Sequence, residues 1–341
     1  MRTLKTILIP ILILLTGIGC NTKKGNPYRE EKKKVVIAYV TSWSNTIPDP
    51  TYITHINYAF GHVNDSFDGV RISNEERLKQ ITALKRETPS LKVLLSIGGW
   101  GSGRFCEMAA DETHRRSFAA DCKRVIHEFD LDGIDIDWEY PTSSMANISS
   151  SPEDTQNYTL LMRDIRAAIG KEMLLTQATV ASAQYIDFKA IDPYIDFTNI
   201  MAYDMASSPK HHAALYRSEN AGGITSDEAV KAHLAAGVPP QKLVLGMPFY
   251  GRADESLSHF TDYKKIEKLT GYTRKWDDTA QVPYLTNDQG LFVCGYDDPQ
   301  SLAIKCQYIL DNGLLGAMYW DYDGDNEAGN LRQTVYNSLN K

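Results

Sequence analysis

Runs of apolar, β-favouring residues alternate along this chain with segments that carry apolar residues at helical spacing. Several runs, such as "KVVIAYV" at 34–40 and "LKVLLSIGGW" at 91–100, are almost continuously apolar. Such runs are typical of strands covered on both faces in a parallel sheet. The pattern predicts eight strands, over residues 34–40, 53–63, 91–100, 131–140, 173–181, 196–205, 242–251 and 315–323.

The segments between these runs include amphipathic helices. In "NEERLKQITALKRE", residues 74–87, Leu78, Ile81 and Leu84 fall on one helical face. Eight strands alternating with helices are typical of an α/β fold, the (β/α)8 TIM barrel. A long stretch at 253–297 predicts a small α+β insertion between strands seven and eight. Further helices are predicted over 111–130, 151–170, 226–237 and 298–313.

The first residues have the layout of an export signal. Arg2 and Lys5 precede an apolar run and then small residues, so we predict a signal peptide over 1–19. Cys20 follows directly and resembles the lipidated first residue of a bacterial lipoprotein. We therefore expect an exported protein, lipid-anchored at Cys20 in the bacterial cell envelope. Plain secretion with an incidental cysteine is the alternative.

A polar tether is predicted over residues 20–33, which are charged and lack apolar periodicity. The catalytic barrel then covers 34–341, with 253–297 as its insertion. Because barrels of this size form one domain, no second folded domain is needed.

Composition and charge narrow the function classes. With 43% hydrophobic and 23% charged residues, the chain has ordinary globular composition. Its net charge of −7 provides no electrostatic footprint for nucleic acid. We expect a monomer whose only membrane contact is the anchor.

Four cysteines lie in the predicted barrel, and none belongs to a CxxC pair, which argues against a zinc site. Export would permit disulfides, but the sequence leaves open whether they pair or stay as buried thiols. They are Cys106, Cys122, Cys294 and Cys306.

The stretch "LDGIDIDWEYP", residues 131–141, places unusual charge inside a predicted strand. Asp135, Asp137 and Glu139 share parity, so they point to the same side, and Asp132 has the opposite parity. The apolar residues between them suit the helix-covered face. The three carboxyls are therefore predicted to line the barrel lumen and to rise toward the C-terminal rim, where barrel active sites lie.

Crowded acids in a partly dry site cannot all ionise, so at least one pKa must rise. Glu139 lies closest to the rim and is the natural proton donor. An ion-paired strand is disfavoured because Lys and Arg are absent from 131–141. A divalent cation is disfavoured because no further ligand pattern accompanies the acids, and "DYDGDN" at 321–326 fails the EF-hand pattern. We expect neither a metal nor a cofactor.

These residues resemble the DxxDxDxE signature of glycoside hydrolase family 18, the chitinases and their relatives. The resemblance extends over residues 34–339 through four further motifs. These are "LLSIGGW" at 94–100, "MAYD" at 201–204, "GMPFYGR" at 246–252 and "GAMYWDYDGD" at 316–325.

The resemblance implies a retaining, substrate-assisted mechanism without an enzyme nucleophile. Glu139 would act as acid and then base, and the 2-acetamido oxygen of the substrate would attack the anomeric carbon. Asp137 would orient the acetamido group, and Asp135 would share a proton with Asp137. Tyr203 would donate its hydroxyl to the acetamido oxygen.

The resemblance also implies a set of substrate-binding residues. Trp320 would form the aromatic floor under the sugar at the cleavage site, and Asp204 would hold sugar hydroxyls or help set the pKa of Glu139. Trp100 would stack on a further sugar or only pack, and Arg252 would contact sugar or pair with a carboxylate. The full set is Asp204, Trp320, Met201, Trp100 and Arg252.

The expected activity is hydrolysis of β-1,4-linked N-acetylglucosamine polymers or oligomers, as in a chitinase. One alternative is an endo-β-N-acetylglucosaminidase that cuts N-glycan cores. The other is a non-catalytic chitin-binding lectin on the same barrel, which the intact Glu139 argues against. The sequence does not separate endo from exo action.

Overall fold

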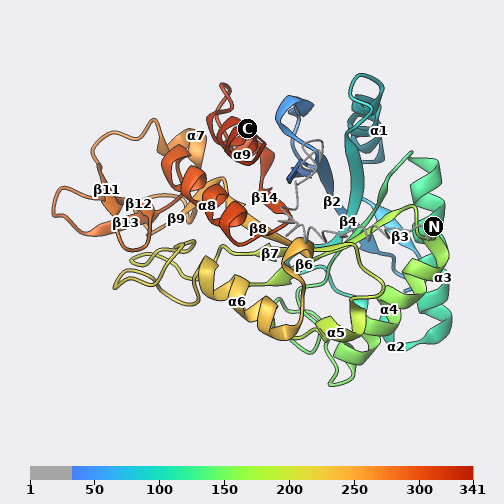
Figure 1. The fold of residues 1–341 in the computed structure, drawn as a ribbon. Coiled ribbons are helices and arrows are strands. Elements are labelled where there is room, and N and C mark those ends of the chain that lie inside the picture. Colours follow the sequence, from blue (N-terminus) through green and yellow to red (C-terminus); the bar gives the residue numbers. More distant parts are fainter. Residues whose placement is uncertain (1–32, 341) are drawn as a thin grey trace, which may run out of the picture. The chain divides into compact units, whose positions relative to one another are not determined.

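The computed structural model describes residues 33–340, so the predicted signal peptide, Cys20 and most of the tether lie outside the described residues. The eight predicted strands are present and form one closed parallel barrel, because β1 pairs with both β14 and β2 (Figure 1). The barrel strands are β1 (Val35–Thr41), β2 (His55–Val63), β4 (Lys92–Gly98), β5 (Gly133–Asp137), β6 (Leu174–Val180), β7 (Phe197–Met201), β8 (Leu243–Pro248) and β14 (Gly316–Trp320).

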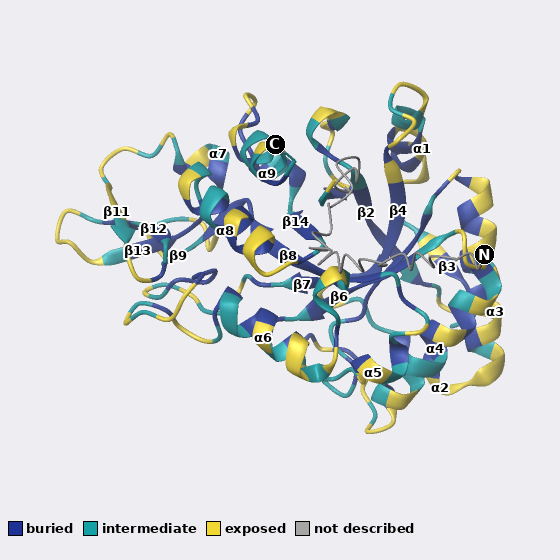
Figure 2. Ribbon diagram, in the orientation of Figure 1, coloured by how far each residue is buried: buried dark blue, intermediate teal, exposed yellow. Residues whose placement is uncertain are grey.

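The strands form because nearly every residue in them is removed from water, whichever face it points to. Figure 2 shows the barrel strands almost uniformly buried, and most exposed positions lie on helices and in loops. On β5 the even positions pack outward as predicted, where Ile134 and Ile136 join the main apolar core. Trp138 stacks on Phe105, with ring centroids 5.3 Å apart. The odd positions of β5 consequently face the lumen.

The five predicted helices are all present and surround the barrel (Figure 1). Three helices that the sequence did not reveal have only four to six residues, too few to show a period. The ten-residue α9 was also missed, although its buried leucines and valine stand four residues apart. The predicted helices are α1 (Glu75–Ala83), α3 (Glu112–Glu128), α4 (Asp154–Ile169), α6 (Ser226–Ala236) and α8 (Pro299–Asp311); the others are α2 (Phe105–Ala110), α5 (Phe188–Ile191), α7 (Tyr263–Ile266) and α9 (Asn330–Leu339).

A second, antiparallel sheet is inserted between β8 and β14, and its order is β10-β9-β13-β12-β11. The predicted strand at 242–251 is in fact two strands, because β8 ends at Pro248 and β9 begins at Tyr250 in the other sheet. One apolar run thus passes from the barrel directly into the insertion. The inserted strands are β9 (Tyr250–Ala253), β10 (Phe260–Asp262), β11 (Thr273–Asp277), β12 (Val282–Thr286) and β13 (Phe292–Gly295); the remaining strand, β3 (Val70–Ile72), pairs antiparallel with the end of β2.

A fully buried ion pair ties the insertion to the barrel. Lys305 on α8 donates from Nζ to Asp297 Oδ2 at 2.6 Å, and both side chains have no exposed surface. The same Nζ donates to the carbonyl oxygen of Ala213 at 2.7 Å. Because a buried charge needs its partner, this lysine fixes the loop after β7 against α8.

The cysteines left open by the sequence are free thiols, and within residues 33–340 no disulfide joins them. Cys122, Cys294 and Cys306 are buried, and Cys106 is partly buried. Over the same residues, no helix is long and apolar enough to cross a membrane.

Candidate active site

A cleft of about 730 Å³ opens at the carboxyl ends of the barrel strands. Of the predicted site residues, Asp135 does not line it, and Cys20 lies outside the described part of the chain. The others come together there from β5, β7, β9 and β14 and the segments that follow the strands. They are Asp137, Glu139, Met201, Tyr203, Asp204, Trp100, Arg252 and Trp320.

Asp135 lies beneath the cleft, fully buried among donors from neighbouring strands. Its carboxyl accepts hydrogen bonds from Tyr39 at 2.8 Å, Ser96 at 2.8 Å, Thr176 at 2.5 Å and Asn199 at 3.2 Å. Burial raises the pKa of Asp135, and these four donors partly offset it. Both oxygens are therefore engaged from the barrel interior, and no hydrogen bond joins this carboxyl to that of Asp137 among the described contacts.

Asp137 is the last residue of β5 and is also almost completely buried. Burial, followed by the negative charges of Glu139 and Asp135, raises the pKa of Asp137 well above its usual value. Its Oδ1 has no hydrogen-bond partner among the described residues. Asp137 is therefore a buried acid that holds its proton more tightly than a free carboxyl, with one oxygen available to a ligand.

Close packing between β4 and β5 holds this residue in position. Gly98 lies opposite Asp137 in the register, and a Cβ at Gly98 would stand 2.0 Å from the Asp137 carbonyl oxygen. Gly98 also has φ +131°, which residues with a side chain rarely adopt. Glycine is thus required at this position of the "LLSIGGW" motif, at the end of β4.

Glu139 stands two residues beyond the end of β5, at the rim of the barrel. Burial, partly offset by a hydrogen bond with Tyr140 and reinforced by the negative charge of Asp204, raises the pKa of Glu139 to about 7. A carboxyl with this pKa can both give and take a proton near neutral pH. The acidic strand thus presents a buried acid with a raised pKa, Asp137, below a second acid, Glu139, with a pKa of about 7.

Asp204, by contrast, is held as a carboxylate. Its Oδ1 accepts hydrogen bonds from Tyr250 Oη at 2.8 Å and from Arg252 Nε at 2.6 Å. His212 Nδ1 lies 3.5 Å from the same oxygen. Burial acts to raise the pKa of Asp204, but His212, Arg252 and Tyr250 together hold it below its usual value.

Tyr203, just before Asp204, supplies a hydroxyl donor to the cleft. Burial, and then the charges of Asp137 and Glu139, raise the pKa of this phenol well above its usual value. Its Oη lies 3.8 Å from Met318 Sδ, a weak acceptor. The hydroxyl therefore stays protonated and can donate a hydrogen bond to a better acceptor.

Aromatic rings line the opposite side. Trp320 stacks on Phe60 with centroids 5.6 Å apart and 18° between the planes, and Tyr39 lies 5.7 Å away. Trp43 and Trp100 are 66% and 61% exposed at the cleft. Flat apolar surface beside a proton donor suits a ligand with an apolar face and polar edges.

The fourth acid of the sequence motif, Asp132, lies at the other end of β5, away from the cleft. It forms ion pairs with Lys85 at 3.1 Å and Lys92 at 3.0 Å, and it accepts the backbone N–H of Val93 at 2.9 Å. Its role is to fasten β5 to β4 and to the segment after α1.

Several lining or supporting residues were not identified from the sequence. Ser96 and Thr176 stand directly opposite Asp135 in the strand register, so strand parity could have revealed them. Tyr140 and Tyr250 lie within the motifs at 131–141 and 246–252 but were not singled out. Loops and the inserted sheet bring in the others, which carry no such signal: Met145, Tyr185, His212, His259 and Phe260.

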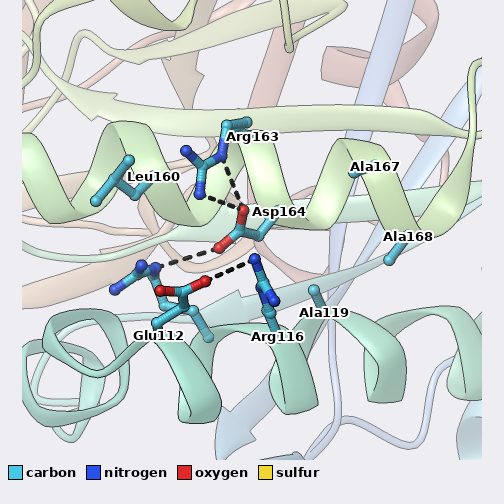
Figure 3. Close-up of a pocket in the computed structure, with 9 residues that line it drawn as sticks. Glu112, Arg116, Ala119, Leu160, Arg163, Asp164, Ala167 and Ala168 are labelled. Carbon is cyan, nitrogen blue, oxygen red and sulfur yellow. Dashed lines mark hydrogen bonds and ion pairs between the residues drawn. The ribbon is translucent and has the colours of Figure 1, made fainter.

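A separate hollow between α3 and α4 does not resemble a binding site. Figure 3 shows its charges paired among themselves, Arg116 with Glu112 and Arg163 with Asp164. Arg115 also pairs with Asp164, at 3.2 Å. In residues 33–340, no group of three or more His, Cys, Asp or Glu side chains could hold a metal ion.

Comparison with known proteins gives a consistent result. A family model described as "Glycosyl hydrolases family 18" matches residues 35–325. Chitinase A1 of Niallia circulans is 32% identical over 85% of this chain, and the chain spans 56% of that protein's length. The structure of a family 18 N-acetylglucosaminidase from Paenibacillus barengoltzii is 33% identical, with a TM-score of 0.81 over 90% of this chain and 100% of that one. A class V chitinase mutant from Nicotiana tobaccum, solved with NAG4, is 26% identical, with a TM-score of 0.80 over 90% and 99%.

Proposed function

The chain belongs to glycoside hydrolase family 18, and we propose that it is a retaining hydrolase of β-1,4-linked N-acetylglucosamine polymers or oligomers, that is, a chitinase. The observation that carries the proposal is the pair formed by Glu139 and Asp137 at the end of β5. Glu139 has a pKa of about 7, and Asp137 is a buried acid with a raised pKa and one oxygen that has no partner among the described residues.

The first step is protonation of the glycosidic oxygen by Glu139. The C1–O bond breaks as the acetamido carbonyl oxygen of the same sugar attacks C1, which gives an oxazolinium ion and a free alcohol. No enzyme nucleophile is required, because the substrate provides it. Asp137 accepts the acetamido N–H through its unpartnered oxygen and so fixes the attacking oxygen in line with C1.

In the second step water attacks C1 from the face that the alcohol has left. Glu139, now a carboxylate, takes the proton of that water, and the C1–oxazoline oxygen bond breaks to restore the acetamido group. Two displacements at C1 give net retention. Tyr203 donates its hydroxyl to the acetamido oxygen and holds it in the attacking position in both steps.

The residues around the acid tune and orient it. Asp204 places a fixed negative charge near Glu139, which favours the protonated form of the acid. Trp320 offers its ring to the apolar face of the sugar at the cleavage site. Met201 lines the same cleft, and Trp100 and Trp43 offer exposed faces to further sugars. Arg252 acts mainly through Asp204, to which it is bonded.

Digestion of chitohexaose beside a high-mannose glycoprotein tests the substrate. Time-resolved cleavage of chitohexaose with an unchanged glycoprotein is the expected result. Release of the N-glycan instead would support the endo-β-N-acetylglucosaminidase alternative, and binding without cleavage would support the lectin. The early product pattern separates endo from exo action. The names of the relatives, chitinase and N-acetylglucosaminidase, leave both modes of action open.

Export and lipid attachment at Cys20 form part of the proposal and are supported by the sequence of residues 1–33 alone. Metabolic labelling with a palmitate analogue should mark the wild-type chain and not Cys20→Ala. Equal labelling of both would contradict the anchor. A monomer is proposed as well, and size-exclusion chromatography with light scattering checks it.

A further inference from the structure

A second hollow, of about 420 Å³, lies against the active-site cleft. The two share Trp43, Phe60 and Trp100, so these rings form a wall with the cleft on one side and the hollow on the other. The remainder is lined by small or basic residues at the ends of β1, β2, β3 and β4 or in the segments that follow them. No aspartate or glutamate lines it, which is unusual in a chain of net charge −7.

Two guanidinium groups converge in this hollow. Arg71 on β3 stands directly opposite His62 on β2 in the antiparallel register. Arg104 comes from the segment before α2, and His62 is linked to that segment by a 2.8 Å contact between its Nδ1 and Ser102 Oγ. Burial, followed by the charges of Arg71 and Arg104, lowers the pKa of His62. The imidazole is therefore neutral near pH 7, and the positive charge comes from the arginines.

The two charges are incompletely neutralised. Arg104 pairs with Asp65 at 2.7 Å, but that carboxylate is 84% exposed and does not line the hollow. Arg71 has no carboxylate within ion-pair distance among the described residues. Because an exposed pair contributes little, a bound anion can replace Asp65 at small cost.

We propose that this hollow binds an anionic substituent, a carboxylate or a sulfate, carried by the N-acetylhexosamine chain that occupies the cleft. The inference rests on the proposed function. The shared tryptophan faces suit a sugar chain that passes along the wall, and arginine forks match the paired oxygens of carboxylate and sulfate. The preferred substrate class would then be acidic aminoglycans rather than neutral chitin alone.

Initial rates on glycol chitin, carboxymethyl chitin and 6-O-sulfated chitin of matched chain length test the inference. Arg71→Gln and Arg104→Gln should each lower the ratio of kcat/KM for the anionic polymers to that for the neutral one by about fivefold, the size of a partly exposed charge pair. The neutral rate should not change. Arg116→Gln on α3, with a side chain 69% exposed, removes the same charge outside the hollow and should leave the ratio unaltered.

The salt dependence of the rates distinguishes recognition of the substrate by charge from recognition by shape. At about 0.5 M NaCl the difference between wild type and the two variants should shrink, because screening weakens exposed charge pairs. A fall limited to the carboxymethyl or to the sulfated polymer supports the inference and identifies the group. An unchanged ratio in both variants, or an equal fall on all three polymers, overturns it.

The neutral polymer separates this inference from the proposed function. No hydrolysis of glycol chitin by the wild type would contradict the proposed function. The ratio of Kd values for anionic and neutral oligomers, measured by isothermal titration on the same variants, would still decide the charge recognition. Arg71→Gln alone suffices if Arg104→Gln does not fold.

Discussion

Replacing Glu139 by glutamine should abolish turnover and at the same time stabilise the protein at alkaline pH. The pKa of Glu139 lies at about 7, against an ordinary value of 4.5. Because the folded protein holds this proton more tightly than the unfolded chain, unfolding releases it between these two pH values. Stability therefore falls as pH rises through that window, and Glu139→Gln removes the fall.

The magnitude follows from the two pKa values. Their difference corresponds to roughly 3 kcal/mol of unfolding free energy when Glu139 alone changes protonation. Glutamine is nearly isosteric with the protonated acid, so wild type and variant should have similar stability at pH 4. Above pH 7 the variant should be more stable by up to about 3 kcal/mol, with less if Asp137 shares the proton.

Urea unfolding followed by tryptophan fluorescence at pH 4, 6 and 8 measures this difference. Glu87→Gln is a matched control, since Glu87 is exposed just after α1 and its substitution should give a difference that does not vary with pH. A difference for Glu139→Gln that is also independent of pH, or that falls as pH rises, would refute the buried, raised-pKa interpretation. If the Glu139→Gln variant is inactive and also less stable than the wild type at pH 8, then Glu139 contributes to packing and its substitution disturbs the fold.

Three further outcomes are expected. Wild-type kcat/KM on a chromogenic chitobioside should decline above about pH 7 as Glu139 loses its proton; a flat profile to pH 9 contradicts its role as acid. Tyr203→Phe should lower kcat by roughly 10²–10³-fold with little change in KM, as for loss of one oxyanion-type donor; steady-state kinetics decides, and a change in KM alone opposes it. Lys305→Met should destabilise the fold by about 3–5 kcal/mol by leaving Asp297 buried and unpaired; thermal unfolding checks this, and Lys305→Met combined with Asp297→Leu should recover much of the loss if charge is the cause.

The alternation of residues along each strand and the spacing of apolar residues along the chain were enough to predict the barrel and the acids that face its lumen. The strands are covered on both faces, so their apolar runs were nearly continuous, and the odd positions of β5 could be assigned to one side. The outward role of Trp138 followed from the same alternation. The motif also placed Tyr203 and Trp320 correctly at one cleft, since carboxyl ends of parallel strands meet at one rim.

Other parts of the site depend on tertiary contacts that leave no trace in a linear pattern. His212 reaches Asp204 only because the loop after β7 folds back. Tyr250 and Phe260 lie on the inserted sheet, whose register against the barrel has no local signature. Asp132 matched the same motif as Asp137 and Glu139 and yet lies at the opposite strand end, where it pairs with two lysines.

The thiols described above have a practical consequence. Cys122, Cys294 and Cys306 have no exposed surface, so a maleimide can reach them only when the surrounding shell opens. A Cys106→Ser variant truncated before residue 33 would carry three built-in reporters, one on α3, one in the inserted sheet and one on α8. Their separate labelling rates would tell whether the inserted sheet opens before the barrel does. Because no oxidant is needed to form these sites, the same protein could be produced in a reducing cytoplasm.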